Sequence, residues 1–385
     1  MEAHNKTQDV VQNSGRSIKS LTLVTAGLPE YDLAKEEADK MPRISLYERT
    51  LGTDVLNESF LSRTKPWRRW LYKRLPFTAS QMIEAYLIRK KYDVVISWAE
   101  RPALLFATIL KLTGSKVPHV ALMSWISKPK KAKVLKRVHT HITRLVLWSS
   151  IQQDFAINHL GIPPEKIRMI TKFADERFFR PMERESDMIC SAGREMRDYP
   201  TLIEAMRGLD IKCHIAVRMR GKMYDTVKAA MNEKSLPQNI TIAGLPPDEL
   251  RELYARSRFV VIPLLPTDTD NGLTVIMEAM AMGKAVICSR VKGQIDIMKD
   301  GVTGIFVPQG DPVALREAIE YLWEHREVAD RMGQEGRRII EQNHTIEGFV
   351  NMMSEIVAET AVEAEALKQY AFPQPVTDTI SPGAH

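Results

Sequence analysis

The sequence predicts an α/β protein made of two doubly wound, Rossmann-like domains that face each other across a cleft. The length of 385 residues is more than one hydrophobic core usually serves, which favours two domains. Hydrophobic residues make up 44% of the chain and charged residues 26%, as in ordinary globular proteins. Short apolar runs alternate with helix-length segments from one end to the other, and this alternation is typical of parallel sheets covered by helices on both faces.

The predicted strands fall into two series. The first consists of the runs at 20–26, 92–98, 119–125, 144–150 and 166–173. The second consists of those at 187–193, 211–217, 239–244, 259–265, 285–289 and 303–308. Amphipathic helical segments separate them, for example 101–112, 150–161, 199–208, 247–257 and 311–325. Two consecutive series of this kind predict two parallel sheets in tandem.

The boundary between the domains is expected within 172–186, KFADERFFRPMERES, where the regular alternation lapses and Pro181 lies among charged residues. The first domain is therefore predicted at 19–175 and the second at 186–345. The segment 346–370 is a long helical pattern with no strand after it, and we expect it to cross back to the first domain.

Both ends of the chain are polar. Residues 1–18 lack the apolar stretch of a signal peptide, and 371–385 are rich in Pro, Ser, Thr and Gly, so both are predicted to be disordered. The three cysteines, Cys190, Cys213 and Cys288, have no metal-ligand spacing and lie in strand-like surroundings. We expect them to be buried free thiols in the reducing cytoplasm.

Positive charge is concentrated in the first half. Residues 61–147 carry 19 Lys or Arg against three acidic residues, whereas the whole chain has a net charge of only +6. This asymmetry favours an anionic partner. The segments 65–76 and 128–142 combine aromatic or aliphatic residues with clustered Lys and Arg. Each either lies on an anionic membrane or packs its apolar face on the first domain. Because no recognition module accompanies the charge, we expect no nucleic acid as a partner.

One stretch combines a phosphate-binding pattern with a buried acid. In DTDNGLTVIMEAMAMGKAVICS, residues 268–289, a strand end leads through Asn271 and Gly272 into an apolar helix. The amides of Leu273 and Thr274 at its start are expected to face an anion, with Asp270 or Asn271 as the helix cap. Glu278 lies inside this helix, where a carboxylate needs a hydrogen-bonding partner. The two hydroxyls of a ribose would supply one, whereas the structural alternative is a pairing with a buried Arg.

These residues resemble a known family. The stretch above, followed by GQIDIMKDGVTGIFVPQGDPVALREAI, is similar to the donor-binding half of the retaining nucleotide-sugar glycosyltransferases of family GT4, which have the GT-B fold. SAGREMRDYPTLIEAM, ITIAGLPPDELRELYARSRFVVIPLL and the interdomain stretch GIPPEKIRMITKFADERFFRP resemble three further family segments in the same order. The resemblance covers residues 142–355 by motif and the first 140 residues by architecture.

The resemblance implies roles for particular residues. Asp270 and Glu278 stand at the family's pair of catalytic-site acids, of which the first contacts the transferred sugar and the second the ribose. The diphosphate of the donor would be held by Gly193, Arg194 and Arg197. Gly244 would lie next to the nucleobase. Asn271, Gly272, Leu273 and Thr274 would complete the donor site.

The chain departs from the family pattern on the acceptor side. Asp270 replaces a glutamate, the glycine-rich loop after the first strand is reduced to Gly27, and Ser124 and Trp125 stand where the family often has a histidine. With Glu100, which follows a first-domain strand, Gly27 and Trp125 are the candidates on the acceptor side.

The expected reaction moves a sugar from a nucleotide-diphosphate sugar to an acceptor with retention of configuration, in the manner of hexosyltransferases. We expect no metal and no cofactor, because Arg194, Arg197 and the helix amides can neutralise the leaving phosphate. Asp268 and Asp270 have Asp-x-Asp spacing, but they directly precede the helix and are expected to contact sugar hydroxyls. The acceptor would be a lipid-linked or other cell-envelope glycan precursor, with the protein in the cytoplasm or on the inner face of the membrane. A non-catalytic nucleotide-sugar-binding partner and a sugar-nucleotide epimerase are the alternatives.

Overall fold

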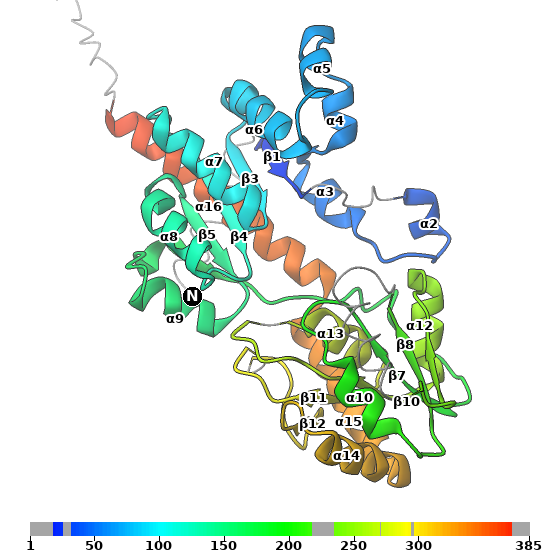
Figure 1. Cartoon of the computed structure of the whole chain (residues 1–385). Helices are drawn as coiled ribbons and strands as arrows, with labels where there is room; N and C mark the ends of the chain where they lie inside the picture. Colours follow the sequence, from blue (N-terminus) through cyan, green and yellow to red (C-terminus); the bar gives the residue numbers. More distant parts are fainter. Residues whose placement is uncertain (1–17, 26–31, 218–234, 270, 294–295, 372–385) are drawn as a thin grey trace, which may run out of the picture.

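The computed structural model describes residues 18–25, 32–217, 235–269, 271–293 and 296–371. It has two lobes, each with its own parallel sheet, and chain order runs from the upper lobe to the lower one and back (Figure 1). The predicted fold class of two doubly wound α/β domains is confirmed. Most of the segments predicted to be disordered, 1–17 and 372–385, lie outside the described residues, as do Gly27 and Asp270.

The first sheet has the strand order β2-β1-β3-β4-β5-β6, and every neighbouring pair is parallel. Its strands are β1 (Ser20–Leu23), β2 (Asp54–Leu56), β3 (Val94–Trp98), β4 (His119–Met123), β5 (Arg144–Leu147) and β6 (Ile167–Met169). The edge strand β2 was not among the predicted strands: it is three residues long and its first residue is exposed, so it lacks the apolar run that marks the central strands. The chain order along the sheet reverses between β1 and β3.

The second sheet has the order β12-β11-β10-β7-β8-β9, again with all neighbouring strands parallel. Its strands are β7 (Met188–Ala192), β8 (Lys212–Ala216), β9 (Ile240–Ile242), β10 (Ser257–Ile262), β11 (Ala285–Ser289) and β12 (Gly304–Val307). This is the order of the dinucleotide-binding Rossmann fold, and it reverses between β7 and β10.

Helices cover both sheets. Those of the first half are α2 (Leu33–Glu37), α3 (Ser45–Leu51), α4 (Glu58–Ser62), α5 (Pro66–Tyr72), α6 (Phe77–Ile88), α7 (Glu100–Leu112), α8 (Pro129–Val138) and α9 (Ser150–Asn158). Those of the second half are α10 (Tyr199–Met206), α12 (Pro247–Arg256), α13 (Leu273–Ala281), α14 (Pro312–Glu324), α15 (Arg326–Asn343) and α16 (Ile346–Ala371). Among the described residues, no helix has the length and apolarity that crossing a bilayer requires.

The last helix joins the two lobes. Although α16 follows the second sheet in sequence, its buried residues pack on the first sheet, where Phe349 and Met353 lie in one cluster with Ile96 and Val120. Figure 1 shows the helix running from the lower lobe along the back of the upper one. At its start, Arg43 binds both Asp175 and Glu347, with Nη2 to Oδ1 and Nη1 to Oε1 distances of 2.6 Å each. The chain therefore crosses between the lobes twice, and Arg43 fastens the two crossings to each other.

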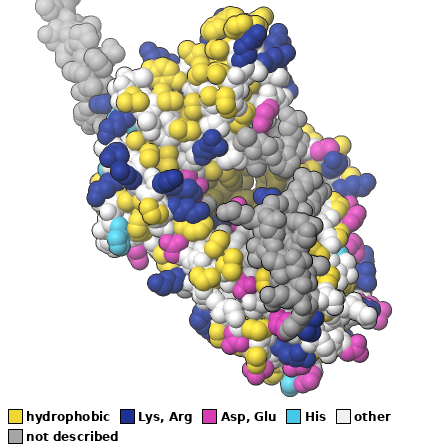
Figure 2. Space-filling model, in the orientation of Figure 1, with side chains coloured by type: hydrophobic (Ala, Val, Ile, Leu, Met, Phe, Trp, Pro, Cys, Tyr) yellow, Lys and Arg dark blue, Asp and Glu magenta, His cyan; other side chains and the backbone are white. Residues whose placement is uncertain are grey.

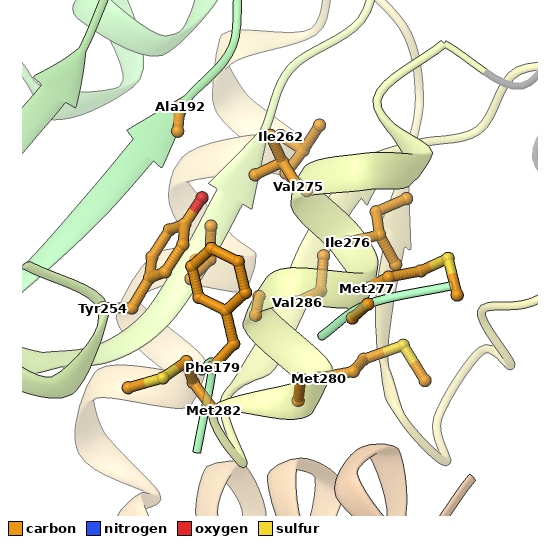
Figure 3. Packing of buried hydrophobic residues seen from close by; sticks show 14 of the residues in the cluster. Phe179, Ala192, Tyr254, Ile262, Val275, Ile276, Met277, Met280, Met282 and Val286 are labelled. Carbon is orange, nitrogen blue, oxygen red and sulfur yellow. The ribbon is translucent and has the colours of Figure 1, made fainter. Parts of the chain in front are cut away.

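The core of the second lobe fixes α13 against its sheet. The helix is bounded by two glycines with left-handed backbone, Gly272 at φ 93° and Gly283 at φ 70°, which allow the sharp turns at its ends. Met277 and Met280 pack in the same cluster as Tyr254, as Figure 3 shows. The three cysteines are buried and free, as predicted.

Candidate functional site

A pocket of about 570 Å³ opens between the lobes, at the carboxyl ends of strands from both sheets. In open α/β sheets, ligands bind beyond the strand ends where the strand order reverses. Gly193 follows β7 and residues 271–274 follow β10, the two strands at that reversal. The pocket is lined by Glu100, Ser124, Trp125, Lys128, Lys131, Lys172, Gly193, Arg194, Glu195, Arg197, Thr269, Asn271, Gly272, Leu273, Thr274 and Val275. Five of these side chains are basic and two are acidic, which suits an anionic ligand.

The start of α13 forms one wall of the pocket. The first backbone bond inside the helix runs from the amide of Ile276 to the carbonyl of Gly272, at 3.1 Å. The amides before Ile276 therefore have no partner within the helix and carry the positive end of its dipole. The expectation that Asn271 caps the helix is wrong: Gly272 is the cap, and the side-chain amide of Asn271 donates to Thr267 Oγ1 at 3.0 Å. The left-handed backbone at residue 272 favours glycine. Because glycine has no side chain, none covers the first amides of α13 at this position.

Arg197 is held beneath this wall with only 7% of its surface exposed. Its Nε donates to the carbonyl of Ala192 at 2.8 Å and its Nη1 to that of Glu195 at 2.9 Å. The guanidinium lies directly against two glycines. A Cβ added at Gly193 would stand 2.2 Å from Nη2 of Arg197, and one added at Gly272 would stand 3.5 Å from its Nη1. Burial lowers the pKa of Arg197, but an arginine begins so far above neutrality that it stays charged. The two glycines thus leave a fixed cation at the base of the pocket.

Arg194 plays a different part from Arg197. It is exposed and lines the same pocket. The turn that carries both arginines is tied to the strand end beside it, since the amide of Leu265 donates to Met196 at 2.9 Å and that of Asp198 to Pro263 at 3.1 Å. Of the two arginines, the buried Arg197 is therefore the one whose position is fixed for binding an anion.

Lysines from the other lobe complete the positive lining, and the sequence did not assign them to this site. Lys128 lies over the ring of Trp125, with Nζ 3.6 Å from its centroid. Lys131 pairs with Glu100, with Nζ 3.2 Å from Oε2. They follow the end of β4, and this position after a strand is the signal that could have assigned them to the site.

Glu100 and Gln152 together hold the loop that carries Trp125. Glu100 Oε1 accepts from the amides of Ser124 at 2.9 Å and Trp125 at 2.7 Å. Gln152, which is fully buried, accepts through Oε1 from the amides of Ile126 at 2.8 Å and Ser127 at 3.3 Å. Four consecutive amides are therefore fixed by two side chains. Burial raises the pKa of Glu100, but the amides and Lys131 outweigh it and hold that pKa below its ordinary value, so Glu100 is an anion.

The same loop is bonded to the other lobe. Ser127 Oγ donates to Asp268 Oδ2 at 2.7 Å, and Gln152 Nε2 donates to the carbonyl of Asp268 at 3.2 Å. Thr269 Oγ1 donates to the carbonyl of Ser124 at 3.1 Å. Asp268, which we expected to contact sugar hydroxyls, thus binds the opposite lobe instead. Asp268 lies just before residues 271–274. The contact between the lobes is therefore adjacent in sequence to the anion-binding wall.

Glu278 is not among the residues that line this pocket, although the lining residue Arg197 acts on its charge. Its Oε2 accepts from the hydroxyl of Tyr254 at 2.9 Å, and the side chain is half-buried. Burial raises the pKa of Glu278 to about 7, against the opposing effects of the Tyr254 hydroxyl and of Arg197. The hydrogen-bond donor to Glu278 within the protein is thus a tyrosine, whereas the structural alternative named a buried Arg.

The structure brings most of the predicted residues to one pocket: Glu100, Trp125, Gly193, Arg194, Arg197, Asn271, Gly272, Leu273 and Thr274. Gly244 is exposed after β9 and does not line it. Asp270 and Gly27 lie outside the described residues. Within the described ranges, no three His, Cys, Asp or Glu side chains gather as a metal site would require.

Known proteins resemble this chain in sequence and in fold. Residues 174–339 match the family model of glycosyl transferases group 1. The O-antigen chain mannosyltransferase C of Escherichia coli is 27% identical over 164 residues, which are 39% of this chain and 44% of that protein. A D-inositol 3-phosphate glycosyltransferase of Frankia alni is 21% identical over 228 residues, 50% of this chain and 54% of that one. The chain thus spans about half the length of the curated relatives it matches.

Two solved structures match nearly the whole chain in fold. A glycosyltransferase from Rickettsia africae superposes with a TM-score of 0.66 at 17% identity, over 90% of this chain and 99% of that one. Anabaena HepE in complex with UDP-glucose superposes with a TM-score of 0.65 at 15% identity, over 90% and 100%. Residues 174–339 are thus similar in sequence to the group 1 glycosyltransferases, and the chain has the two-domain GT-B fold of the solved structures that it matches.

Proposed function

We propose that the protein transfers a sugar from a nucleotide-diphosphate sugar to an acceptor, with the donor bound by the second lobe. The observation that carries this proposal is the convergence of Arg197, Arg194 and the open end of α13 at the strand reversal. The proposal is supported by relatives described as glycosyltransferases and by a neighbour solved with UDP-glucose. We take the sugar to be a hexose, as the relative named as a mannosyltransferase suggests.

The lining can stabilise the leaving group without a metal ion. As the bond to the sugar breaks, negative charge gathers on the departing diphosphate, and fixed donors aimed at that charge lower the barrier. Arg197 is already immobilised by two carbonyls, so it needs no reorganisation at that moment. In a retaining transfer on one face of the sugar, the departing phosphate takes the proton of the acceptor hydroxyl. The mechanism then needs no separate protein base.

A ligand screen tests the donor half of the proposal. A nucleotide that binds only the folded protein raises the free energy of unfolding by about 2.7 kcal/mol at a hundred times its Kd. We expect one nucleoside diphosphate, and its sugar, to raise the melting temperature while the other bases do not. Transfer or donor hydrolysis should follow with that donor and persist in EDTA. Indifference to every nucleotide would contradict the proposal, and binding without turnover would favour the non-catalytic alternative.

Gln152 offers a second prediction, concerning the contact between the lobes. Gln152→Leu leaves the buried amide of Ile126 and the partly buried amide of Ser127 without their acceptor, which should lower the free energy of unfolding by about 1–3 kcal/mol. It should also lower kcat more than it weakens nucleotide binding, because the Trp125 loop is freed, whereas the segment before α13 loses only the bond at the Asp268 carbonyl. Gln152→Glu keeps the acceptor for Ile126 and Ser127 but loses the donor to Asp268.

The neighbouring Gln153, half-buried on the same helix, supplies the matched control as Gln153→Leu. Chemical denaturation gives the stabilities, and steady-state kinetics give kcat and KM. If Gln152→Glu lowers kcat although its stability is normal, the link between the lobes contributes to turnover; if Gln152→Leu behaves as the control, the loop has no such role.

We propose that the acceptor side is formed by the first lobe and that the acceptor is a lipid-linked or other cell-envelope glycan precursor. The structure separates the two basic segments that could meet a membrane. On α8, Leu135 and Val138 are buried in the core, and Lys131 lines the pocket between the lobes, as does Lys128 just before the helix. On α5, Trp67 and Trp70 are exposed. The proposal of a peripheral association with the inner face of a membrane therefore retains 65–76 alone.

A further inference from the structure

A segment of the first half of the chain, residues 32–45, extends from the first lobe to the second, and we call it the strap. It begins with α2 and ends at the start of α3, and Figure 1 shows α2 beside α12 of the lower lobe. The strap is fastened to its own lobe at α3, where Glu36 Oε1 accepts from the amide of Ser45 at 2.9 Å. Its other contacts are with the second half of the chain.

Asp39, in the turn that follows α2, binds two arginines of the second half. Its Oδ2 accepts from Nη2 of Arg180 at 2.7 Å, and its Oδ1 accepts from Nη1 of Arg251 at 2.9 Å. The carbonyl of Asp39 also accepts from Nη2 of Arg251, at 3.1 Å. The backbone of Asp39 is left-handed, at φ 57°, which is uncommon for a residue other than glycine. This conformation lets one residue bind Arg251 through both its side chain and its carbonyl.

The pairing with Arg251 is more than a surface ion pair. Arg251 lies on α12 and is only 7% exposed. Its Nη1 also donates to the carbonyl of Phe178 at 3.2 Å, and its guanidinium lies over the ring of that residue, 4.3 Å from the centroid. The carboxylate that pairs with this buried cation comes from the first lobe. Moving the lobes apart would leave the cation buried without that carboxylate, which is unfavourable.

The strap is attached both at the pivot between the lobes and beyond it. The first crossing is fixed to the second lobe, since Arg337 Nη1 donates to the carbonyl of Glu176 at 2.9 Å. Just before this point the two crossings pair with each other through a bridge at Ala174, where a rotation of the lobes would be centred. Arg43 binds at this junction, whereas Asp39 binds to α12. The Asp39 contact is therefore the one that a rotation would break.

The other contacts between the lobes lie away from the strap. Ser150, at the start of α9, donates through Oγ to Asp296 Oδ1 at 2.8 Å, and Gln152 on the same helix binds the carbonyl of Asp268. In Figure 1, α9 lies at the left of the molecule and α2 at the right. Figure 2 shows both acidic and basic side chains at the right-hand edge. The lobes are thus held at two separate places, and only one of them remains when the strap is released.

We propose that the strap is a latch between the lobes, in which Asp39 pairs with Arg251 and Arg180 to hold the lobes in the arrangement seen here. When the latch is released, the lobes open about the two crossings. The pocket between the lobes takes Lys131 from the first lobe and Arg197 from the second, so its complete lining exists only while the lobes are held together. The consequence for sugar transfer rests on the proposed function, but the latch itself does not.

Single-molecule fluorescence energy transfer in the full chain measures the arrangement of the lobes without any ligand. Leu112→Cys with Val313→Cys places one dye on α7 and one on α14, at exposed positions of the two lobes, and the native cysteines are buried. In this background, Asp39→Asn removes the charge and keeps a side chain that tolerates left-handed backbone. We expect it to raise the fraction of open molecules about tenfold, the effect of losing a half-exposed charged hydrogen bond.

Asp32→Asn is the matched control, because the Asp32 carboxylate pairs within the strap, 3.4 Å from Lys35 Nζ, and asparagine also caps helices. Arg180→Gln removes the more exposed half of the latch and should open the lobes less than Asp39→Asn does. High salt should act on the wild type in the same direction, because it screens exposed charges. Equal melting temperatures check folding. The proposal is contradicted if Asp39→Asn and Asp32→Asn give the same distribution of distances.

The outcome is separable from that of the nucleotide screen. A protein whose open fraction rises in Asp39→Asn but that binds no nucleotide would retain the latch and refute the proposed donor function. A protein that binds nucleotide and shows no opening in Asp39→Asn would retain the donor site and refute the latch.

Discussion

A Glu278→Gln protein is expected to bind its nucleotide about ten to a hundred times more weakly than the wild type and to lose most transfer, because it loses a charged hydrogen-bond acceptor. Glu278 is the ionisable side chain on α13, and its pKa of about 7 means that both protonation states are populated near neutral pH. The carboxylate accepts from ribose hydroxyls better than the acid does. Wild-type nucleotide affinity should therefore rise as the pH rises through 7, and the affinity of Glu278→Gln should lack this component.

The same substitution is expected to stabilise the fold at high pH. The folded-state pKa of about 7 lies above the ordinary value of 4.5, so the folded protein holds the proton more tightly than the unfolded chain. The resulting stability is fully present below the ordinary pKa and is lost as the pH rises through the folded-state value. Glutamine does not titrate, so the difference in unfolding free energy between Glu278→Gln and the wild type should shift in favour of the variant from pH 5 to pH 8.

Isothermal titration and urea unfolding over that pH range measure the two effects. Tyr254→Phe is the matched variant, since it removes the hydroxyl that donates to Glu278 and keeps the carboxylate. We expect it to raise the pKa of Glu278 further and to move the affinity increase to higher pH. If Glu278→Gln shows the stability change but binds nucleotide normally, the carboxylate is only a structural partner of Tyr254.

The fold could be predicted because its signal is local. The central strands, such as β10 (Ser257–Ile262), are apolar on both faces and need no tertiary information to be recognised. The edge strand Asp54–Leu56 gave no such signal, because it is only three residues long and begins with an exposed Asp. The pocket followed from the same reasoning, since parallel strands direct their carboxyl ends to one edge and Gly193 and Gly272 each follow a strand.

The remaining parts of the site depend on contacts between residues far apart in sequence. Nothing in the sequence distinguishes Gln152 from other helix residues. Only the folded chain shows that it binds both the Trp125 loop and Asp268. Asp268 has Asp-x-Asp spacing with Asp270 in sequence, yet its carboxylate accepts a hydrogen bond from Ser127 of the other lobe.

Arg197→Gln is expected to lower kcat/KM by about a hundred- to a thousandfold, which is the usual effect of removing one preorganised donor to a developing anion. Arg194→Gln should cost about tenfold, because an exposed charge interacts through water. Ionic strength separates the two: salt should weaken the contribution of the exposed Arg194 and leave that of the buried Arg197 nearly unchanged. Kinetics at low and high salt give both values, and a larger, salt-insensitive loss at Arg194 would contradict the assignment.

Gly193→Ala tests the same cation without removing it. The new Cβ would lie 2.2 Å from Nη2 of Arg197, and the backbone at φ 96° disfavours any side chain, so the guanidinium must move. Gly208→Ala has a comparable backbone, at φ 79°, with nothing within 4 Å of its added Cβ, and therefore controls for the backbone strain alone. If the position of the guanidinium is what matters, Gly193→Ala should approach Arg197→Gln in kcat/KM although every charge is present, while Gly208→Ala keeps its activity. Equal activity in the two glycine variants would mean that the charge of Arg197 suffices without its fixed placement.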